Sequence, residues 1–185
     1  MELRYDSHRI EVPDRRVITL VGSLKEASAR SIITGIIKSA QEAQEQEKPE
    51  PVVLLIDSKG GETNQVFAIM DVKSLWNVSL ITIGTGYVYS AGLFLLQIGD
   101  IRLATRHASL LLHVGSVKTE EDSPRDLESS LRACRAIDQK VISLLARRTG
   151  KRTKQIAIDW QSDRYFTPRQ ARGYGPRGLI DGIVA

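Results

Sequence analysis

Ser90 stands between a glycine-punctuated turn and a strongly apolar segment, in the run GTGYVYSAGLFLLQIGD at residues 84–100. A serine at such a junction commonly caps a helix, and its hydroxyl becomes a nucleophile only when a base takes its proton. Histidine is the usual base, and a third group must orient it. The first question is therefore whether the chain can bring a histidine and an acid to Ser90.

His113 is the histidine best placed to act as that base. His8 lies in a polar N-terminal segment and His107 in a predicted turn, whereas His113 falls in the apolar run SLLLHV at residues 109–114. Open α/β sheets carry their reactive groups at strand ends, because the strands are rigid and the loops that follow are open. A purely structural histidine is the alternative. Spacing alone does not choose the acid among Asp100, Asp122, Asp126, Asp138, Asp159, Asp163 and Asp181.

Acyl transfer also needs hydrogen-bond donors for the oxyanion of the tetrahedral intermediate, each worth about 3 to 4 kcal/mol. Gly60 and Gly61 follow the apolar run PVVLLID and its SK extension. Glycine can expose a backbone N–H there, because it turns the chain with no side chain in the way. The N–H of Ala91, in the first turn of the helix predicted after Ser90, can supply a second donor. A plain tight turn is the alternative interpretation of the glycine pair.

Other familiar site patterns do not occur around Ser90 and the glycine pair. Val88 occupies the place of the first glycine of a GxSxG motif, and Gly60 and Gly61 belong to neither a GxGxxG nor a GxxxxGK[ST] pattern. The His, Cys and acidic residues show no metal-ligand spacing, so we expect no metal and no cofactor. From the residues alone, the sequence indicates a serine nucleophile on an α/β scaffold and leaves the reaction open.

The elements that must position these residues alternate between strand and helix. Apolar or β-branched runs predict strands over residues 16–22, 51–57, 79–84, 101–105 and 109–114. Apolar stripes and capping signals predict helices over residues 23–47 and 65–75, from near Ser90, and from Pro124, capped by Ser123, to Gly150. A last short helix and the strand-like LIDGIVA close the chain. This alternation favours an α/β fold with crossover connections.

The composition predicts a single globular domain, with 42% hydrophobic residues in a chain of 185. The net charge of +4 arises mainly between Arg147 and Arg177, which we interpret as a solvated face because no nucleic-acid-reading motif accompanies it. The single cysteine, Cys134, excludes an intrachain disulfide and is expected to be an apolar filler. Without an apolar signal core or a membrane-length apolar run, the sequence predicts a cytoplasmic protein with no nucleic-acid or membrane partner.

Together, these segments resemble the Clp protease proteolytic subunit family (ClpP), from about Val17 to the C-terminus. DSKGG resembles the family's glycine pair after a buried strand, and YSAGLFLL resembles its nucleophile segment. SLLLHV resembles the strand that ends in its catalytic histidine, and TGKRTKQIAIDWQSDRYFT the helix that leads to its catalytic acid. Four motifs in the same order with matching spacings make the resemblance specific.

The resemblance implies a Ser-His-Asp triad of Ser90, His113 and Asp163, with the N–H groups of Gly61 and Ala91 as the oxyanion hole. In this assignment Ser90 attacks the scissile carbonyl, His113 carries the proton and Asp163 orients the imidazole. The implied activity is that of a serine endopeptidase, a hydrolase that degrades unfolded polypeptides or peptides inside an oligomeric chamber.

The resemblance also implies a ClpP/crotonase-like α/β fold of repeated βαβ units with a protruding handle helix. We expect one peptidase domain over residues 1–185, with a short N-terminal segment over about 1–16 and a handle region over about 115–150. Two heptameric rings, a homo-oligomeric tetradecamer, would enclose the active sites, with an ATPase unfoldase as a candidate partner. The apolar stripe of the helix after Pro124 suits a partner surface, and packing against its own domain is the alternative.

The sequence departs from the family pattern beside the predicted site. Lys59 stands where the family has proline, and bulky Tyr89 replaces a small residue before the nucleophile. Val114-Gly115 follow the histidine in place of Gln-Pro, and Asp159 matches a noncatalytic aspartate of the family. We therefore expect a substrate pocket that is narrower or differently shaped.

Two other functions compete with a peptidase. A noncatalytic ClpP-like subunit of a mixed ring would keep the fold, but it would have no reason to retain Ser90, His113 and Asp163 together. An acyl-CoA hydratase or isomerase of the related crotonase superfamily would need carboxylates near the acyl group and no serine–histidine pair. The chain is also short for a crotonase.

Overall fold

Parallel strands form the centre of the computed structural model, which describes residues 1–43, 50–115 and 123–184. They are β3 (Val17–Val21), β4 (Val52–Ser58), β5 (Leu80–Tyr89) and β6 (Ile101–Thr105), each paired in parallel with the next. The crossover helices are α1 (Glu26–Ala43), α2 (Thr63–Leu75) and α3 (Ala91–Leu96). The apolar runs of β4 and β5 are buried on both faces, as is typical of strands inside a parallel sheet.

Two further strands extend the sheet beside the second half of β5. β7 (Ser109–Leu112) pairs in parallel with β5 from Tyr87 to Tyr89, and β8 (Arg164–Phe166) pairs antiparallel with β7. The carboxyl ends of β4, β5 and β7 therefore meet on one side of the sheet, where the segments with catalytic potential begin.

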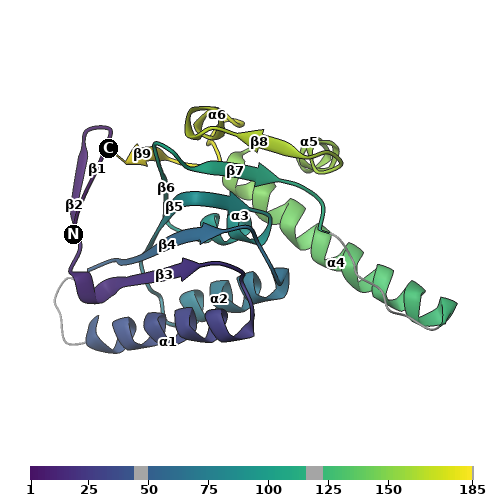
Figure 1. Cartoon of the computed structure of the whole chain (residues 1–185), viewed down its shortest axis with the longest axis horizontal. Helices are drawn as coiled ribbons and strands as arrows, with labels where there is room; N and C mark the ends of the chain where they lie inside the picture. The colour runs from purple at the N-terminus through teal and green to yellow at the C-terminus, as the bar shows by residue number, and fades with distance from the viewer. Residues whose placement is uncertain (44–49, 116–122, 185) are drawn as a thin grey trace.

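The two ends of the chain lie side by side at the opposite end of the sheet (Figure 1). β1 (Glu2–Tyr5) and β2 (His8–Glu11) form an antiparallel hairpin, and the short helix η1 (Asp14–Arg16) links it to β3. β9 (Gly182–Val184) pairs with both β6 and β1, so it joins the hairpin to the main sheet.

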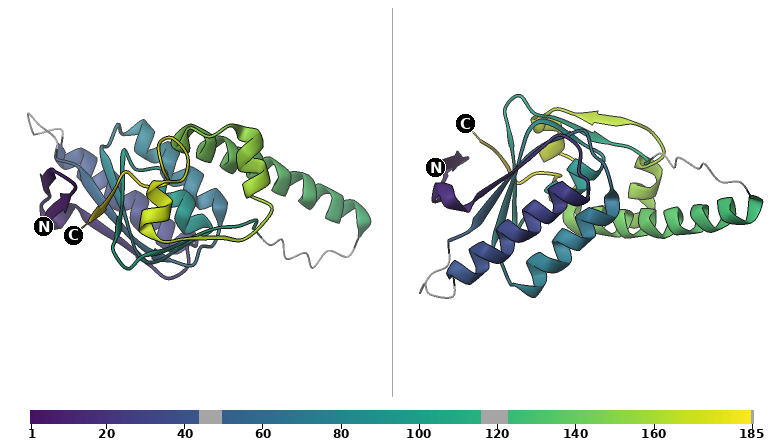
Figure 2. Two further views of the ribbon diagram at one scale, coloured as in Figure 1. Left: turned by 90° about the horizontal axis from the view of Figure 1, so that it is seen from above. Right: turned by 60° about the horizontal axis from the view of Figure 1, so that its bottom comes forward.

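A long helix, α4 (Pro124–Thr149), projects away from the body of the molecule (Figures 1 and 2). Its caps follow the predicted signals: the Ser123 side chain accepts a hydrogen bond from the Asp126 N–H at 3.2 Å, and Gly150 ends the helix with a φ of 73°. The short helices α5 (Thr153–Asp159) and α6 (Pro168–Arg172) flank β8. The predicted α/β fold of repeated βαβ units with a protruding helix is confirmed.

Each face of the sheet has its own apolar cluster. The larger cluster lies under α1, α2 and α3, which cover one face (Figure 2), and includes Ile32, Leu54 and Phe94. The smaller cluster lies on the other face, where Leu3 and Tyr5 of the hairpin pack with neighbours that include Ile81.

Several predicted boundaries were wrong. α1 begins at Glu26 and not at residue 23, because Leu24 instead forms a parallel bridge with Gly61. The predicted turn before Ser90 is the continuation of β5, which extends to Tyr89. Residues 1–16 contain a hairpin that was not predicted, and two short helices follow α4 where one was expected. The predicted end of the first helix and the first part of the handle region fall partly in 44–49 and 116–122, outside the described residues.

Candidate active site

Ser90 forms a sharp turn between β5 and α3. Its φ of 53° and ψ of −123° are rare for a residue other than glycine, and backbone strain of this kind is concentrated at functional sites. The turn is held from both sides, because the Ser90 N–H donates to the Leu111 carbonyl at 3.0 Å and the Ser90 carbonyl accepts from the Leu93 N–H at 2.9 Å. Within the described residues, the Ser90 hydroxyl accepts no capping hydrogen bond from α3. The cap interpretation therefore does not explain this serine.

The glycine pair packs directly against Ser90. A Cβ atom on Gly60 would lie 2.8 Å from the Cβ of Ser90 and 3.3 Å from the Ala91 nitrogen. A Cβ atom on Gly61 would lie 2.1 Å from the Leu24 carbonyl oxygen, so no side chain fits at either position. The buried Ser58 hydroxyl accepts a hydrogen bond from the Gly60 N–H at 3.0 Å. The two glycines therefore do more than form a tight turn, because they let the segment after β4 pack directly against Ser90 and Leu24.

Two backbone donors are free beside this contact. The Leu24 N–H donates to the Gly60 carbonyl, and the Leu24 carbonyl accepts from the Glu62 N–H, both at 2.9 Å. In this parallel bridge the N–H of Gly61 therefore points away from Leu24. Among the described residues, neither the Gly61 N–H nor the Ala91 N–H has a hydrogen-bond acceptor. Unused donors next to a nucleophile are what an oxyanion hole requires.

The pairing of β7 with β8 brings His113 opposite Asp163. Leu112 is the last residue of β7 and pairs with Arg164, the first residue of β8, so the residue after β7 faces the one before β8. The Nδ1 atom of His113 lies 3.9 Å from the Oδ1 atom of Asp163. This separation is longer than a hydrogen bond, and catalytic hydrogen bonds are often long in the absence of substrate. No hydrogen bond joins Ser90 to His113 in the part of the chain that the structure describes.

The other acids considered from the sequence have different partners or places. Asp100 binds Lys73 and the Leu80 N–H, and Asp181 binds Arg102. Asp126 accepts from the Ser123 hydroxyl at the start of α4. Asp138 lies on α4, where burial raises the pKa of its carboxyl, and Asp122 lies outside the described residues.

Asp159 is buried, and its carboxylate binds several residues around the loop that carries Asp163. The Tyr174 hydroxyl donates to its Oδ2 atom at 2.7 Å, Lys151 binds the same oxygen, and Arg164 pairs with Oδ1. Burial opposes ionisation of Asp159, but the hydrogen bonds from Lys151, Tyr174 and Gln155 hold its pKa below the ordinary value of 3.8. Burial and the bond to Asp159 raise the pKa of Tyr174. Because Asp159 and Arg164 bracket the loop, their ion pair fixes the segment that carries Asp163.

Tyr89 was noted from the sequence, but its contacts with other aromatic rings beside the site were not predicted. The ring of Tyr89 meets Tyr87 and Tyr165 edge-on, with centroid distances of 5.2 and 5.9 Å, and its hydroxyl lies 3.0 Å from the Ser109 hydroxyl. The Lys59 ammonium lies 4.7 Å from the centroid of the Tyr87 ring. Lys59 and Tyr89, two departures from the family pattern, therefore both contact Tyr87. The alternate spacing of Tyr87 and Tyr89 is the signal that could have indicated them.

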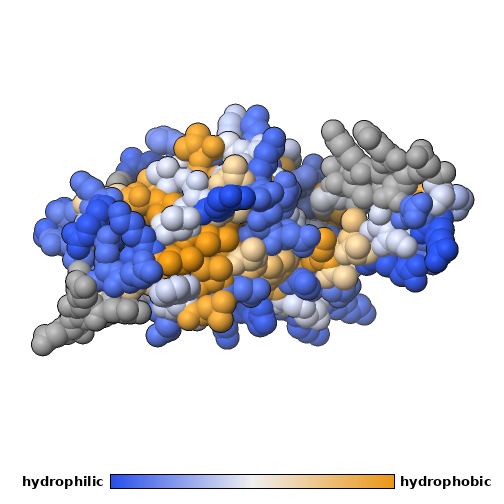
Figure 3. All heavy atoms as spheres, turned by 90° about the horizontal axis from the view of Figure 1, so that it is seen from below, coloured by the Kyte–Doolittle hydropathy of each residue, from blue (hydrophilic) through white to orange (hydrophobic). Residues whose placement is uncertain are grey.

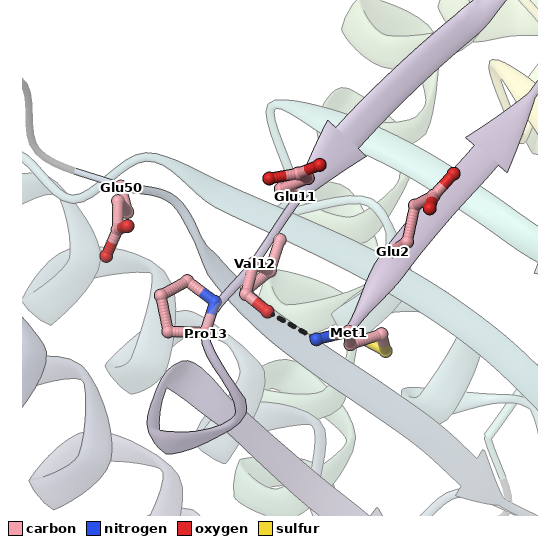
Figure 4. A pocket seen from close by; sticks show the side chains of 6 residues that line it. All are labelled: Met1, Glu2, Glu11, Val12, Pro13 and Glu50. Atoms are coloured by element: carbon pink, nitrogen blue, oxygen red, sulfur yellow. Dashed lines mark hydrogen bonds between the residues drawn. The ribbon is translucent and has the colours of Figure 1, made fainter.

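A separate hollow of about 410 Å³ lies beside the N-terminal hairpin (Figure 4). Three glutamates contribute to its lining, and the Met1 amine donates to the Val12 carbonyl at 2.7 Å. Of the described residues, those that line it are Met1, Glu2, Glu11, Val12, Pro13 and Glu50, and none of their side chains is a serine, threonine or cysteine nucleophile. It therefore does not compete with Ser90 as an active site.

The described residues contain neither a candidate metal-binding group nor a helix that could span a membrane. They hold no group of three or more His, Cys, Asp or Glu residues arranged for a metal ion. None of the helices in the described ranges combines the length and apolar character needed to cross a membrane.

Known proteins with similar sequences share one description. The family model described as Clp protease matches residues 4–185. ATP-dependent Clp protease proteolytic subunit 1 of Bacillus cereus (strain ATCC 10987 / NRS 248) is 29% identical over 188 residues, covering 99% of this chain and 91% of that protein. Subunit 2 of Prochlorococcus marinus (strain NATL2A) is 27% identical, over 91% of this chain and 82% of that protein. The proteolytic subunit of Pleurastrum terricola is 28% identical, over 92% and 84%.

Proposed function

The chain belongs to the Clp protease family, a family of serine peptidases, and from this premise we propose that Ser90, His113 and Asp163 form its catalytic triad. The contact between Gly60 and Ser90 carries the proposal, because it places free backbone donors beside a serine whose backbone is strained. The β7–β8 register supports it further, since it sets His113 opposite Asp163 at the same end of the sheet.

In the proposed mechanism, His113 takes the proton of the Ser90 hydroxyl as the oxygen attacks the scissile carbonyl. The resulting oxyanion accepts hydrogen bonds from the N–H groups of Gly61 and Ala91. His113 then gives the proton to the leaving amine, and a water molecule releases the acyl group from Ser90 by the reverse sequence. Asp163 keeps the imidazole in the correct orientation and stabilises its charged form.

We further propose that the substrates are unfolded polypeptides or peptides, cleaved inside a homo-oligomer of two heptameric rings in the cytoplasm. Leu127 and Leu131 of α4 are 39% and 41% exposed, which suits a helix that meets a partner. Phe67 and Met70 line a groove of about 400 Å³ between α2 and α4, and apolar surface spreads over this side of the molecule (Figure 3).

An ATPase unfoldase is the proposed partner that would deliver substrates. The three relatives are named ATP-dependent, and this is the property that we carry over to the present chain. A noncatalytic subunit of a mixed ring is the second candidate function, favoured by the 3.9 Å separation of His113 and Asp163.

The test is the intact mass of the protein after treatment with a fluorophosphonate, which reacts readily with an activated serine. We expect one adduct on the wild type, none on Ser90→Ala, and one on the control Ser31→Ala, which alters an exposed serine of α1. An unlabelled wild-type protein would contradict the peptidase proposal and favour the noncatalytic subunit.

A further inference from the structure

The strand that leads into Ser90 has two more residues than its neighbour over the same stretch. Ile56 pairs with Gly84 and Ser58 pairs with Val88, so β4 advances by two residues while β5 advances by four. Thr85, Gly86 and Tyr87 therefore lie opposite the single residue Asp57. Such a bulge interrupts the hydrogen-bond ladder and re-aims the strand that carries it.

The bulge lies close along the chain to both Ser90 and the glycine pair. Tyr87 of β5 precedes Ser90 by three positions, and Asp57 of β4 precedes Gly60 by three positions. The bulge consequently fixes how far Ser90 has advanced relative to the glycine pair. The contact between them tolerates little error, since even a Cβ atom on Gly60 would collide with Ser90.

The side chain of Asp57 fills the gap that the bulge leaves in the ladder. Its Oδ1 atom accepts a hydrogen bond from the Tyr87 N–H at 2.8 Å. The Thr85 hydroxyl donates to the Ile56 carbonyl at 3.3 Å, which closes the other end of the bulge. Gly86 has a φ of 33°, and a Cβ atom there would lie 2.6 Å from the Asp57 Oδ1 atom. The bulge and the carboxylate therefore fit each other closely.

We infer that Asp57 is a positioning residue for hydrolysis: its carboxylate holds the β5 bulge in the register that sets Ser90 against Gly60 and Gly61. The inference rests on the proposed function, and it adds a residue that touches neither the triad nor the oxyanion donors in these contacts. A carboxylate oxygen makes a strong acceptor for a backbone N–H. Errors of about 1 Å in the placement of a catalytic group can cost about 100-fold in rate.

The experiment compares Asp57→Ala, Asp57→Asn and the control Glu26→Ala, which alters an exposed carboxylate on α1. We expect Asp57→Ala to lower kcat and the rate constant of fluorophosphonate labelling by about 10- to 100-fold, with KM unchanged and labelling still complete. Asp57→Asn keeps the Oδ1 acceptor and should stay close to the wild type, as should the control. A merely structural role would instead reduce the fraction that can be labelled, at an unchanged rate constant.

Amide hydrogen exchange supplies a readout that does not depend on catalysis. In Asp57→Ala the amides from Tyr87 to Ser90 should exchange faster than in the wild type, whereas Asp57→Asn should protect them. A wild type that is never labelled would refute the proposed function, and exchange would then decide alone whether Asp57 holds the bulge. Wild-type labelling rates in Asp57→Ala, or an Asp57→Asn variant as slow as Asp57→Ala, would overturn the inference.

Gly86 allows the same contact to be broken from its other side. In Gly86→Ala the new methyl group would collide with the Asp57 carboxylate, so labelling should slow. The double variant with Asp57→Ala removes that collision, and we expect its combined loss to be smaller than the product of the two single losses. Losses that multiply would show that the two residues act separately, and would overturn the assignment.

Discussion

At the scale of single residues, the site is set by backbone conformations that few residue types adopt. Ser90 has a φ of 53° and Gly60 a φ of 111°, and the two residues touch. The chemistry of Ser90 and of the glycine pair could be proposed from residue types, because a nucleophile and exposed N–H groups are local properties. The choice of Asp163 could not, since an acid can come from any segment and only a resemblance selected it.

Gly60→Ala should lower the peptidase activity of the folded protein as well as its stability. The added methyl group would lie 2.8 Å from the Cβ of Ser90, and the positive φ adds strain of about 1 to 3 kcal/mol. We expect labelling of Ser90 to fall by about 100-fold in the molecules that remain folded. The measurement is the labelling rate constant, read beside the melting temperature.

Gly22→Ala is the matched control for that change. Gly22 also has a positive φ, of 95°, but a Cβ atom there would meet nothing within 4 Å. This variant should therefore show the backbone strain without the collision, and it should label at the wild-type rate. Equal labelling rates in the two variants would show that the contact between Gly60 and Ser90 is not needed.

At the scale of elements, boundaries set by neighbouring residues could be predicted from the sequence, whereas boundaries set by distant contacts could not. The ends of α4 could be predicted, because Ser123, Pro124 and Gly150 act on the backbone beside them. The true length of β5 could not, since its last residues are extended only through their pairing with β4 and β7. The start of α1 was misplaced for the same reason, as Leu24 is held by the distant Gly61.

Asp159 should make the packing of α5 against β8 sensitive to acid. Its folded pKa is below 3.8, so its ionised form stabilises the fold at every pH above that value. The contribution is lost as the pH falls through 3.8 toward the lowered pKa, because protonation weakens the bonds from Lys151 and Tyr174. We expect Asp159→Asn to lower the free energy of unfolding by about 2 kcal/mol at neutral pH.

Urea unfolding at several pH values measures this effect. The difference between the wild type and Asp159→Asn should be constant above about pH 5 and should shrink below it. Asp6→Asn is the control, because Asp6 forms an exposed ion pair with Arg172 that is worth less than about 1 kcal/mol. A difference for Asp159→Asn that does not change with pH would contradict the proposed role of its charge.

At the scale of the whole molecule, the exposed side of α4 makes a prediction about size. Light scattering of the wild type should show a particle many times heavier than the 20.6 kDa chain. Leu131→Glu should break that particle into smaller species, since it places a charge on the proposed contact surface. Leu75→Glu, at a position 83% exposed on α2, is the control and should leave the particle intact. A monomeric wild type would contradict the proposed chamber.

The central parallel strands of the sheet were predicted from the sequence, whereas the short strands β1, β2 and β8 at its edges were not. Long apolar strands such as β4 identify themselves, whereas β1 and β2 are four residues each, too short for alternation to be recognised. β8 is shorter still, with three residues, and its place depends on tertiary contacts: its pairing with β7 and the ion pair between Arg164 and Asp159.

The pairing of β8 with β7 can be lost, and the site with it, while the rest of the sheet stays folded. The proposed acid is attached to the rest of the site through a three-residue strand at the edge of the sheet, while Ser90 and the glycine pair follow the central strands β5 and β4. Fraying of β8 from β7 would carry Asp163 away from His113 and leave the parallel strands paired. The ion pair between Asp159 and Arg164 therefore guards catalysis as well as stability, because it opposes an opening that would silence the site in a molecule that is still folded.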